Sequence, residues 1–277
     1  MLARAVTTML FSVLTTRAFA PPRALARFVE CVRVIDAPEL ARLRYERLPD
    51  GKTELVVRID GRGADAGAMG TRTRAVSKDA GPLASAVVVR FRAAGAYPFF
   101  GMPMSELTDR HTSIETLWGG SGRALEDALA GARSGEARVR VMLSALEARL
   151  ASDRVFEPAA AATVRRATRT IAAMETLPRV DALAAHVGLS ERQLRRAFDA
   201  VIGVGPKHYL RIVRFQRAIA MLRADVPRPP WGVIARDAGY FDQAHMIAEL
   251  REMTGRAPSE LARRLAERRR ELALRNP

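Results

Sequence analysis

An internal repeat in the C-terminal half constrains the fold of this 277-residue chain more than any other feature. Two segments match at an offset of 52 residues. Each contains a helix-capping residue, two apolar residues four positions apart, a glycine and a proline in the same order. The matched pairs are Ser190 and Asp242, Leu194 and Met246, Phe198 and Leu250, Gly203 and Gly255, and Pro206 and Pro258. Since side chains at i and i+4 share one helix face, each copy predicts a capped helix with one buried face.

A shorter helix is predicted just before each capped helix, at Val180–Val187 and at Gly232–Ala238. Each is followed by a glycine that ends it in a left-handed conformation and by an apolar residue that fills the turn. These residues are Gly188 with Leu189 in the first copy and Gly239 with Phe241 in the second. Two helices joined by a tight glycine turn form a helix-turn-helix, so the sequence predicts this unit twice.

A longer helix is predicted between the two units, at Pro206–Leu222, and its length of about 25 Å follows from the rise per residue. The prolines Pro227, Pro229 and Pro230 end it. Two recognition helices joined by a rod of that length are suited to successive major-groove segments about 34 Å apart on one face of DNA.

The outward faces of the two capped helices carry side chains that suit base edges. The first presents Arg192, Gln193, Arg195 and Arg196, and the second presents Gln243, Ala244 and His245. Arginine pairs with guanine or with phosphate, glutamine pairs with adenine, and alanine contacts the thymine methyl group. The alternative for either helix alone is a helical hairpin with a solvated polar face.

The charge of the chain supports an anionic partner. The formal net charge is +15 and the isoelectric point is about 11.3. Such an excess favours nucleic acid first and an acidic membrane surface second. Cys31 is the only cysteine and forms no internal disulfide, and no apolar run reaches about 18 residues. We therefore expect a cytoplasmic protein without stable membrane association.

The N-terminal half is predicted to be β-rich and then helical. Strands are expected at Leu43–Leu48 and Leu55–Ile59, joined by a turn at Pro49-Asp50-Gly51, and at Ala86–Phe91. Four glycines indicate a loop at Gly61–Gly70. Helices are expected from Ser121, as a cap, to about Ala130, and from Glu136 to Leu150. The second helix carries an apolar stripe that fits either core packing or a dimer seam.

The fold class predicted overall is α+β, with a β-rich N-terminal domain followed by helices and an all-α module with two helix-turn-helix units and a linker helix. The expected domains are a sensor or dimerisation domain at 21–152 and a DNA-binding domain at 161–270. Residues 1–20 fit either a weak export signal or an upstream extension.

The repeat resembles the AraC/XylS family of bacterial transcription regulators. The resemblance is carried by residues 183–190 and 194–198 in the first unit, and by Ile234-Ala235, residues 238–245 and residues 254–259 in the second. It implies a sequence-specific regulator that binds promoter DNA, with RNA polymerase, a small-molecule effector and a second copy of the chain as further partners. The implied DNA-binding residues are Ser190, Arg192, Gln193, Arg195, Arg196, Gln243, Ala244 and His245. Ala248 departs from the family pattern, in which Arg or Lys is frequent, and this predicts weaker or less specific DNA binding by the second unit.

The N-terminal half resembles an uncharacterised domain that is often joined to this module. The matching segments are residues 47–51, 54–55, 89–92, 95–100 and 107–109. The resemblance implies a sensor or dimerisation role without naming a ligand. The aromatic segment Tyr97–Phe100 fits either a ligand pocket or the core.

Two other functions compete with a specific DNA reader. An enzyme is the first, but the four histidines have no metal-ligand spacing, and neither Cys31 nor the pair Asp50 and Glu54 has an activating motif around it. We therefore expect no catalytic residues, no metal and no cofactor. The second is a non-specific basic protein that coats nucleic acid. This alternative is favoured by the arginines of the C-terminal tail, namely Arg263, Arg264, Arg268, Arg269 and Arg270. Only a specific reader keeps a large affinity gap over random DNA.

Overall fold

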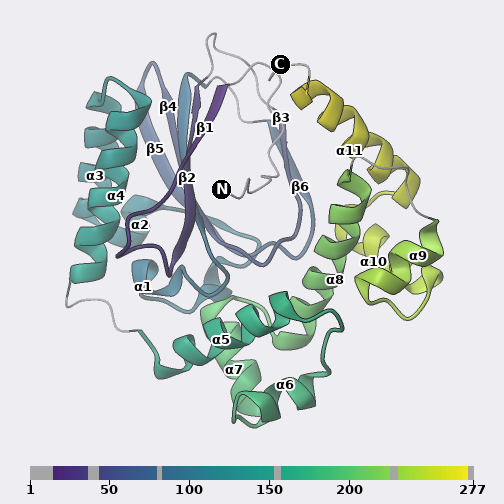
Figure 1. Cartoon of the computed structure of the whole chain (residues 1–277). Helices are drawn as coiled ribbons and strands as arrows, with labels where there is room; N and C mark the ends of the chain where they lie inside the picture. The colour runs from purple at the N-terminus through teal and green to yellow at the C-terminus, as the bar shows by residue number, and fades with distance from the viewer. Residues whose placement is uncertain (1–14, 37–43, 80–82, 153–156, 225–229, 274–277) are drawn as a thin grey trace.

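The computed structural model describes residues 15–36, 44–79, 83–152, 157–224 and 230–273 (Figure 1). The N-terminal half is built on a six-stranded antiparallel sheet. Its strands, in spatial order, are β1 (Thr15–Phe19), β2 (Val29–Asp36), β7 (Ser85–Phe91), β4 (Glu54–Asp60), β5 (Gly63–Met69) and β8 (His111–Ser113). A separate two-stranded sheet pairs β3 (Arg44–Arg47) with β6 (Val76–Asp79). Strand β7 is buried along its whole length, as its run of valines predicts.

Helices α3 (Gly120–Gly131) and α4 (Gly135–Ala151) lie side by side against the large sheet (Figure 1). The apolar stripe of α4 faces this sheet, since Val139, Met142 and Leu146 are buried in the same core as the β7 valines. The stripe therefore packs in the core. Ser134 caps α4, with its hydroxyl accepting from the amide of Ala137 at 3.1 Å.

The aromatic segment belongs to the core as well. Short helix α1 (Tyr97–Phe100) is followed by the 3-10 helix η1 (Met104–Leu107) and by α2 (Ile114–Trp118). The Phe99 ring lies 5.1 Å from that of Phe91, and Phe100 stacks at 6.4 Å on Trp118. Phe99 and Phe100 are buried among these rings and belong to the core of the large sheet.

Two local predictions for the N-terminal half, the loop at Gly61–Gly70 and the cap at Ser121, are wrong. The segment Gly61–Gly70 is not a loop, because most of it is strand β5. Its glycines allow close approach, since a Cβ at Gly67 would collide with the His111 ring and one at Gly70 with the backbone of Leu107. The predicted turn at Pro49-Asp50-Gly51 joins β3 to β4: Gly51 has a φ of +67°, and the Asp50 carboxylate accepts from the amide of Lys52 at 3.1 Å. The two strands do not pair with each other, because they lie in different sheets.

Helix α3 begins one residue before its predicted cap. Gly119 is the N-cap residue, and the hydroxyl of Ser121 donates to the carbonyl of Trp118 at 2.7 Å. At the N-terminus, residues 15–19 pair with β2 as strand β1, so this part of the predicted 1–20 segment belongs to the sheet. The rest of that segment, 1–14, lies outside the described residues.

The C-terminal half is entirely helical in its described residues. Its helices are α5 (Ala159–Ala173), α6 (Val180–His186), α7 (Glu191–Val201), α8 (Pro206–Arg223), α9 (Trp231–Ala238), α10 (Gln243–Thr254) and α11 (Pro258–Ala273). They enclose a second core in which Leu194, Phe198, Met246 and Leu250, the apolar residues of the repeat, are fully buried. The predicted α+β class is confirmed. The prolines Pro227 and Pro229 lie outside the described residues.

The two halves are joined by hydrogen bonds to backbone carbonyls just after α7 and in the last turn of α10. After α7, Ile202 O accepts from the Thr71 hydroxyl and Gly203 O from the Thr108 hydroxyl, both at 2.6 Å. After α10 begins its last turn, Met253 O accepts from the amide of Ala75 at 2.6 Å. The segment 70–75 between β5 and β6 therefore contacts both copies of the repeat.

Candidate nucleic-acid interface

The first helix-turn-helix unit consists of α6 and α7. Gly188 ends α6 with a φ of +72°, and the amide of Leu189 donates to the carbonyl of Ala184 at 3.0 Å. Ser190 caps α7, and Gln193 closes a capping box because its side-chain oxygen accepts from the Ser190 amide at 2.9 Å. The predicted turn and cap are thus present in this unit.

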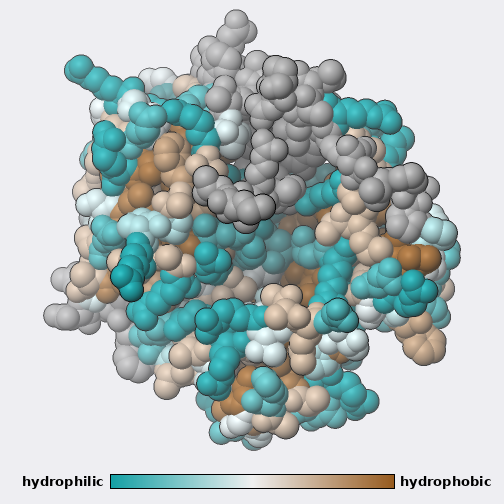
Figure 2. Space-filling view, in the orientation of Figure 1, coloured by the Kyte–Doolittle hydropathy of each residue, from teal (hydrophilic) through white to brown (hydrophobic). Residues whose placement is uncertain are grey.

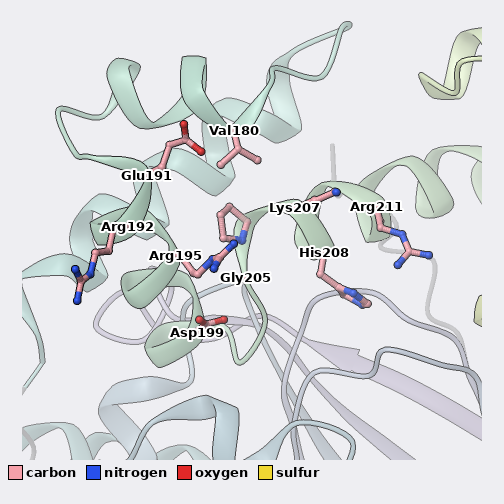
Figure 3. Close-up of a pocket in the computed structure, with 10 residues that line it drawn as sticks. Val180, Glu191, Arg192, Arg195, Asp199, Gly205, Lys207, His208 and Arg211 are labelled. Carbon is pink, nitrogen blue, oxygen red and sulfur yellow. The ribbon is translucent and has the colours of Figure 1, made fainter.

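Gln193 and the arginines of α7 have different settings. Arg192, Arg195 and Arg196 are exposed, whereas the side-chain oxygen of Gln193 is occupied by the cap. In Figure 3, Arg192 extends away from the helix pair, and Arg195 points toward Gly205 at the start of α8. Arg192 and Arg195 therefore point in different directions.

The second unit consists of α9 and α10 and differs in its turn. Gly239 has a φ of +91°, and the amide of Tyr240 donates to the carbonyl of Ala235 at 2.8 Å. Tyr240 is buried, whereas Phe241 is 92% exposed. The prediction that Phe241 fills the turn is therefore wrong. The second turn has one more residue between the glycine and the cap, so Tyr240 takes the place of Leu189 and Phe241 points into solvent.

The cap of α10 and the side chain of His245 are both defined by short contacts. The Asp242 carboxylate accepts from the amide of His245 at 2.7 Å. The His245 ring packs edge-on to Tyr240 at 5.5 Å, and its Nε2 lies 3.3 Å from Glu249. Gln243 and Ala244 are exposed, but His245 is half-buried. Of the three residues predicted on this face, two point outward and His245 leans toward the body of the unit.

Glu249 links the second unit to the linker helix. This buried carboxylate accepts from Arg211 at 3.0 Å and from Arg214 at 2.9 Å, both on α8. The Arg214 guanidinium also lies 5.4 Å from the centre of the Tyr240 ring. Burial raises the pKa of Tyr240, so its hydroxyl stays neutral at physiological pH. These contacts fix the orientation of α10 on α8.

A hollow surface lies between the two units, over the N-terminal part of α8. One cavity of about 820 Å³ is lined by α7 and α8, and a neighbouring one of about 960 Å³ extends to α10. Both share Lys207 and Arg211, which sequence reasoning did not assign (Figure 3). The sequence contains a signal for Lys207, because this basic residue directly follows Pro206, the predicted start of the linker helix. Burial, with a smaller contribution from Arg211, lowers the pKa of His208 beneath this surface.

The two exposed helix faces differ in charge. The face of α7 carries three arginines and Glu191, whereas the repeat places Ala244, Ile247 and Ala248 where α7 has Arg192, Arg195 and Arg196. Arg251 and Glu252 are the exposed charges nearest the end of α10. The first unit is therefore the more attractive one for a polyanion.

Asp50 and Glu54, considered above as paired carboxylates, lie in a buried charge cluster around Arg90. Arg90 donates to Glu54 at 2.8 Å and to Asp50 at 2.6 Å, and Arg33 donates to Glu54 at 3.2 Å. Burial alone would raise the pKa of Glu54, but Arg47, Arg90 and Arg33 hold it at about 2. Glu54 therefore stays ionised at neutral pH and is held in ion pairs with buried arginines.

Other candidates for chemistry have ordinary settings in the described part of the chain. Cys31 is buried, and burial raises the pKa of its thiol, so this thiol is not activated as a nucleophile. Among the described residues no three His, Cys, Asp or Glu side chains gather at metal-binding distance. Arg263 and Arg264 in the tail pair with Glu267 and Glu260. The side chains of Arg268 and Arg269 lie outside the described residues.

In the part of the chain that the structure describes, no helix combines the length and the apolar character that crossing a membrane requires. On the face shown in Figure 2, hydrophilic side chains separate small apolar patches.

Comparison with known families identifies both halves. Residues 183–264 match the family described as a helix-turn-helix domain, and residues 17–113 match a domain of unknown function (DUF6597). The first match covers both helix-turn-helix units, and the second spans the large sheet from β1 to β8. No curated protein sequence matches the chain.

Several solved structures are similar to parts or most of the chain. A regulator with an AraC-type DNA-binding domain from Chromobacterium violaceum shares 27% identity over 38% of this chain and 93% of its own, with a TM-score of 0.34. A probable AraC family regulator from Rhodopseudomonas palustris CGA009 shares 27% identity over 38% of this chain and 97% of its own, at 0.33. ToxT from Vibrio cholerae O395 shares 10% identity over 91% and 98% of the two chains, at 0.42.

Proposed function

We propose that this chain, a DNA-binding transcriptional regulator that carries an AraC-type helix-turn-helix domain, binds promoter DNA by placing α7 and α10 in two adjacent major-groove segments. The observation that carries the proposal is the pairing of two capped helix-turn-helix units on one linker helix. Helix α8 has 18 residues and is therefore about 27 Å long. A rod of this length is comparable to the roughly 34 Å between successive major-groove segments.

The exposed residues of the first unit supply most of the attraction to DNA in this proposal. Arg192 and Arg196 project from α7 and pair with base edges, and Arg195 faces the hollow beside α8 with Lys207, where a phosphate fits. Ser190 and Gln193 form the cap, so they contribute by orienting the first turn toward the backbone of DNA.

The second unit contributes selectivity with less charge. Gln243 and Ala244 are exposed at the start of α10 and suit adenine and a thymine methyl group. His245 contacts DNA only at its exposed edge, because Tyr240 and Glu249 hold the ring. RNA polymerase, a small-molecule effector and a second copy of the chain are further partners that we propose for such a regulator, acting in the cytoplasm.

Selection of DNA fragments by the purified full chain tests this function. Random genomic fragments are selected at low salt and at near-physiological salt, and the bound fraction is sequenced. Recovery of a shared motif with two segments about one helical turn apart supports the proposal. Recovery of unrelated fragments that are lost together as salt rises identifies a non-specific basic binder instead. Arg196→Ala is expected to weaken binding to the selected motif by about 1–3 kcal/mol. Arg263→Ala, which removes a tail arginine paired with Glu267, is the matched control and should leave this binding unchanged.

A further inference from the structure

An open cavity of about 620 Å³ lies where the N-terminal half meets α5 and α8. Its wall on the N-terminal side comes from the start of β2 and the residues before it, from Lys52 between β3 and β4, and from the residues after β7. Its other wall comes from α5 and from Tyr209 of α8. The charged residues that line it are Arg27, Glu30, Lys52, Arg92, Arg165 and Arg169. This volume lies in the range of small-molecule sites and is far too small for a nucleic-acid duplex.

The lining has more positive charge than the structure neutralises. Lys52 Nζ lies 2.6 Å from Glu30, and Arg165 pairs with Glu157. Arg27, Arg92 and Arg169 have no carboxylate partner among the described residues. Three exposed arginines that line one cavity thus have no carboxylate to balance their charge in the part of the chain that the structure describes.

Other contacts hold these three guanidinium groups. Arg92 Nε donates to the carbonyl of Ala26 at 2.8 Å, and Arg169 Nε donates to the carbonyl of Arg165 at 3.4 Å. The Arg27 guanidinium lies 4.4 Å from the centre of the Phe28 ring. Each group is positioned by one edge or face and keeps further N–H donors for another acceptor, since guanidinium carries five of them.

The shape of the cavity also fits a small ligand. Four alanines with short side chains line it between the charged groups, namely Ala26, Ala93, Ala162 and Ala172. Guanidinium groups bind carboxylate and phosphate oxygens in a bidentate manner. We propose that this cavity binds a small organic anion with two or three carboxylate or phosphate groups, held by Arg27, Arg92 and Arg169.

The cavity adjoins the first helix-turn-helix unit through one ring. Tyr209 lines the cavity, and its ring lies 5.7 Å from that of Phe198 on α7. The same ring lies close to Gly51, where a Cβ would come within 2.7 Å of it. An anion in the cavity therefore contacts both halves of the protein, next to the residue that supports α7. The binding site itself does not depend on the proposed DNA-binding function.

Isothermal titration of the full chain without DNA tests this proposal. Citrate is the carboxylate probe and pyrophosphate is the phosphate probe, and each is compared with chloride at equal ionic strength. We expect saturable binding of at least one probe, and the stronger of the two identifies the preferred acceptor. Arg92→Gln and Arg169→Gln are each expected to weaken the binding of this probe at least tenfold. Ala162→Leu, which fills the cavity without changing its charge, should weaken it by a similar factor.

Two matched variants separate the cavity from general attraction to a basic protein. Arg166→Gln removes an exposed charge on α5 outside the cavity lining, and Arg192→Gln removes one from the proposed DNA-binding face. Both should keep the affinity within twofold. Absence of saturable binding with both probes, or equal weakening in Arg166→Gln or Arg192→Gln, overturns the proposal. Full-affinity binding by Ala162→Leu also overturns it, since the ligand then lies elsewhere.

Discussion

At the scale of single residues, neighbouring arginines of α7 are expected to act differently on DNA. Arg192 extends freely from the helix, while Arg195 faces Gly205 and the hollow beside α8 (Figure 3). We expect Arg192→Ala to cost about 1–3 kcal/mol on the best site and to change which bases are preferred. Arg195→Ala should weaken binding to all DNA sequences alike and reduce the slope of log affinity against log salt concentration by about 1. Titrations on the selected site and on random DNA at several salt concentrations measure both effects. Equal behaviour of the two variants contradicts this division.

Gln243 is expected to contribute selectivity more than affinity. It is exposed on the first turn of α10, and among the DNA-binding candidates of the second unit its side chain is the one best suited to adenine. Gln243→Ala should relax base preference in the second half-site and leave the first half-site unchanged. Repeating the fragment selection with this variant measures the preference. An unchanged motif would remove Gln243 from the interface.

Glu54 is expected to make the protein sensitive to acid. Its folded-state pKa of about 2 lies below its ordinary value of 4.5, because Arg47, Arg90 and Arg33 outweigh the effect of burial. The stabilisation is therefore complete above about pH 4.5 and is lost as the pH falls toward 2. Urea unfolding between pH 7 and pH 3 measures the decline. Glu54→Gln should lower the free energy of unfolding at pH 7 by about 3–5 kcal/mol, because it leaves buried guanidinium groups unpaired. It should also flatten the pH dependence.

At the scale of elements, the segment 70–75 and the turn after η1 hold the first helix-turn-helix unit. Thr71 and Thr108 donate to the carbonyls of Ile202 and Gly203, directly after α7. Thr71→Val and Thr108→Val keep the side-chain shape but leave a carbonyl without its donor. Each should lower the free energy of unfolding by about 1–3 kcal/mol. Because the same segment bonds to Met253 of α10, we expect these variants to weaken binding to a double site more than to a single half-site.

Thr73→Val is the matched control for this comparison. The Thr73 hydroxyl donates to Asp109 at 2.5 Å, so this bond stays within the N-terminal half. It should lower stability slightly without changing the ratio of double-site to half-site affinity. A ratio that changes equally in all three variants would mean that the bonds only stabilise the fold.

At the scale of the whole molecule, both helix-turn-helix units are fixed to one rod and to one N-terminal half. Glu249 bonds Arg211 and Arg214, and Arg256 pairs with Glu46 beside it. Because these contacts fix the two helix-turn-helix units relative to each other, the units cannot reorient to bind half-sites on different faces of the DNA. Insertion of five base pairs between the half-sites should therefore reduce affinity at least tenfold, because it places them on opposite faces. Gel-shift titration of the spaced sites measures this, and equal affinity at all spacings would show independent units.

The sequence by itself determined the features that depend on neighbouring residues. The caps Ser190 and Asp242, the glycines Gly188 and Gly239 and the apolar pairs at i and i+4 form within one or two helical turns, so the double helix-turn-helix was predictable. The buried strand at β7 and the helix at α4 followed from the same local patterns. The exposure of the α7 arginines followed as well, because the buried face was already assigned.

Only the tertiary structure decided the features that depend on distant partners. The glycine-rich strand β5 owes its place to the close approach of β8 and η1, and β3 pairs with β6 some thirty residues away rather than with β4. The extra residue in the second turn exposes Phe241 because Tyr240 already fills the space over Ala235. Arg27, Arg92 and Arg169 line one cavity although they come from three separate segments of the chain. Such pairings are chosen by long-range packing and charge, and no window along the chain contains both partners.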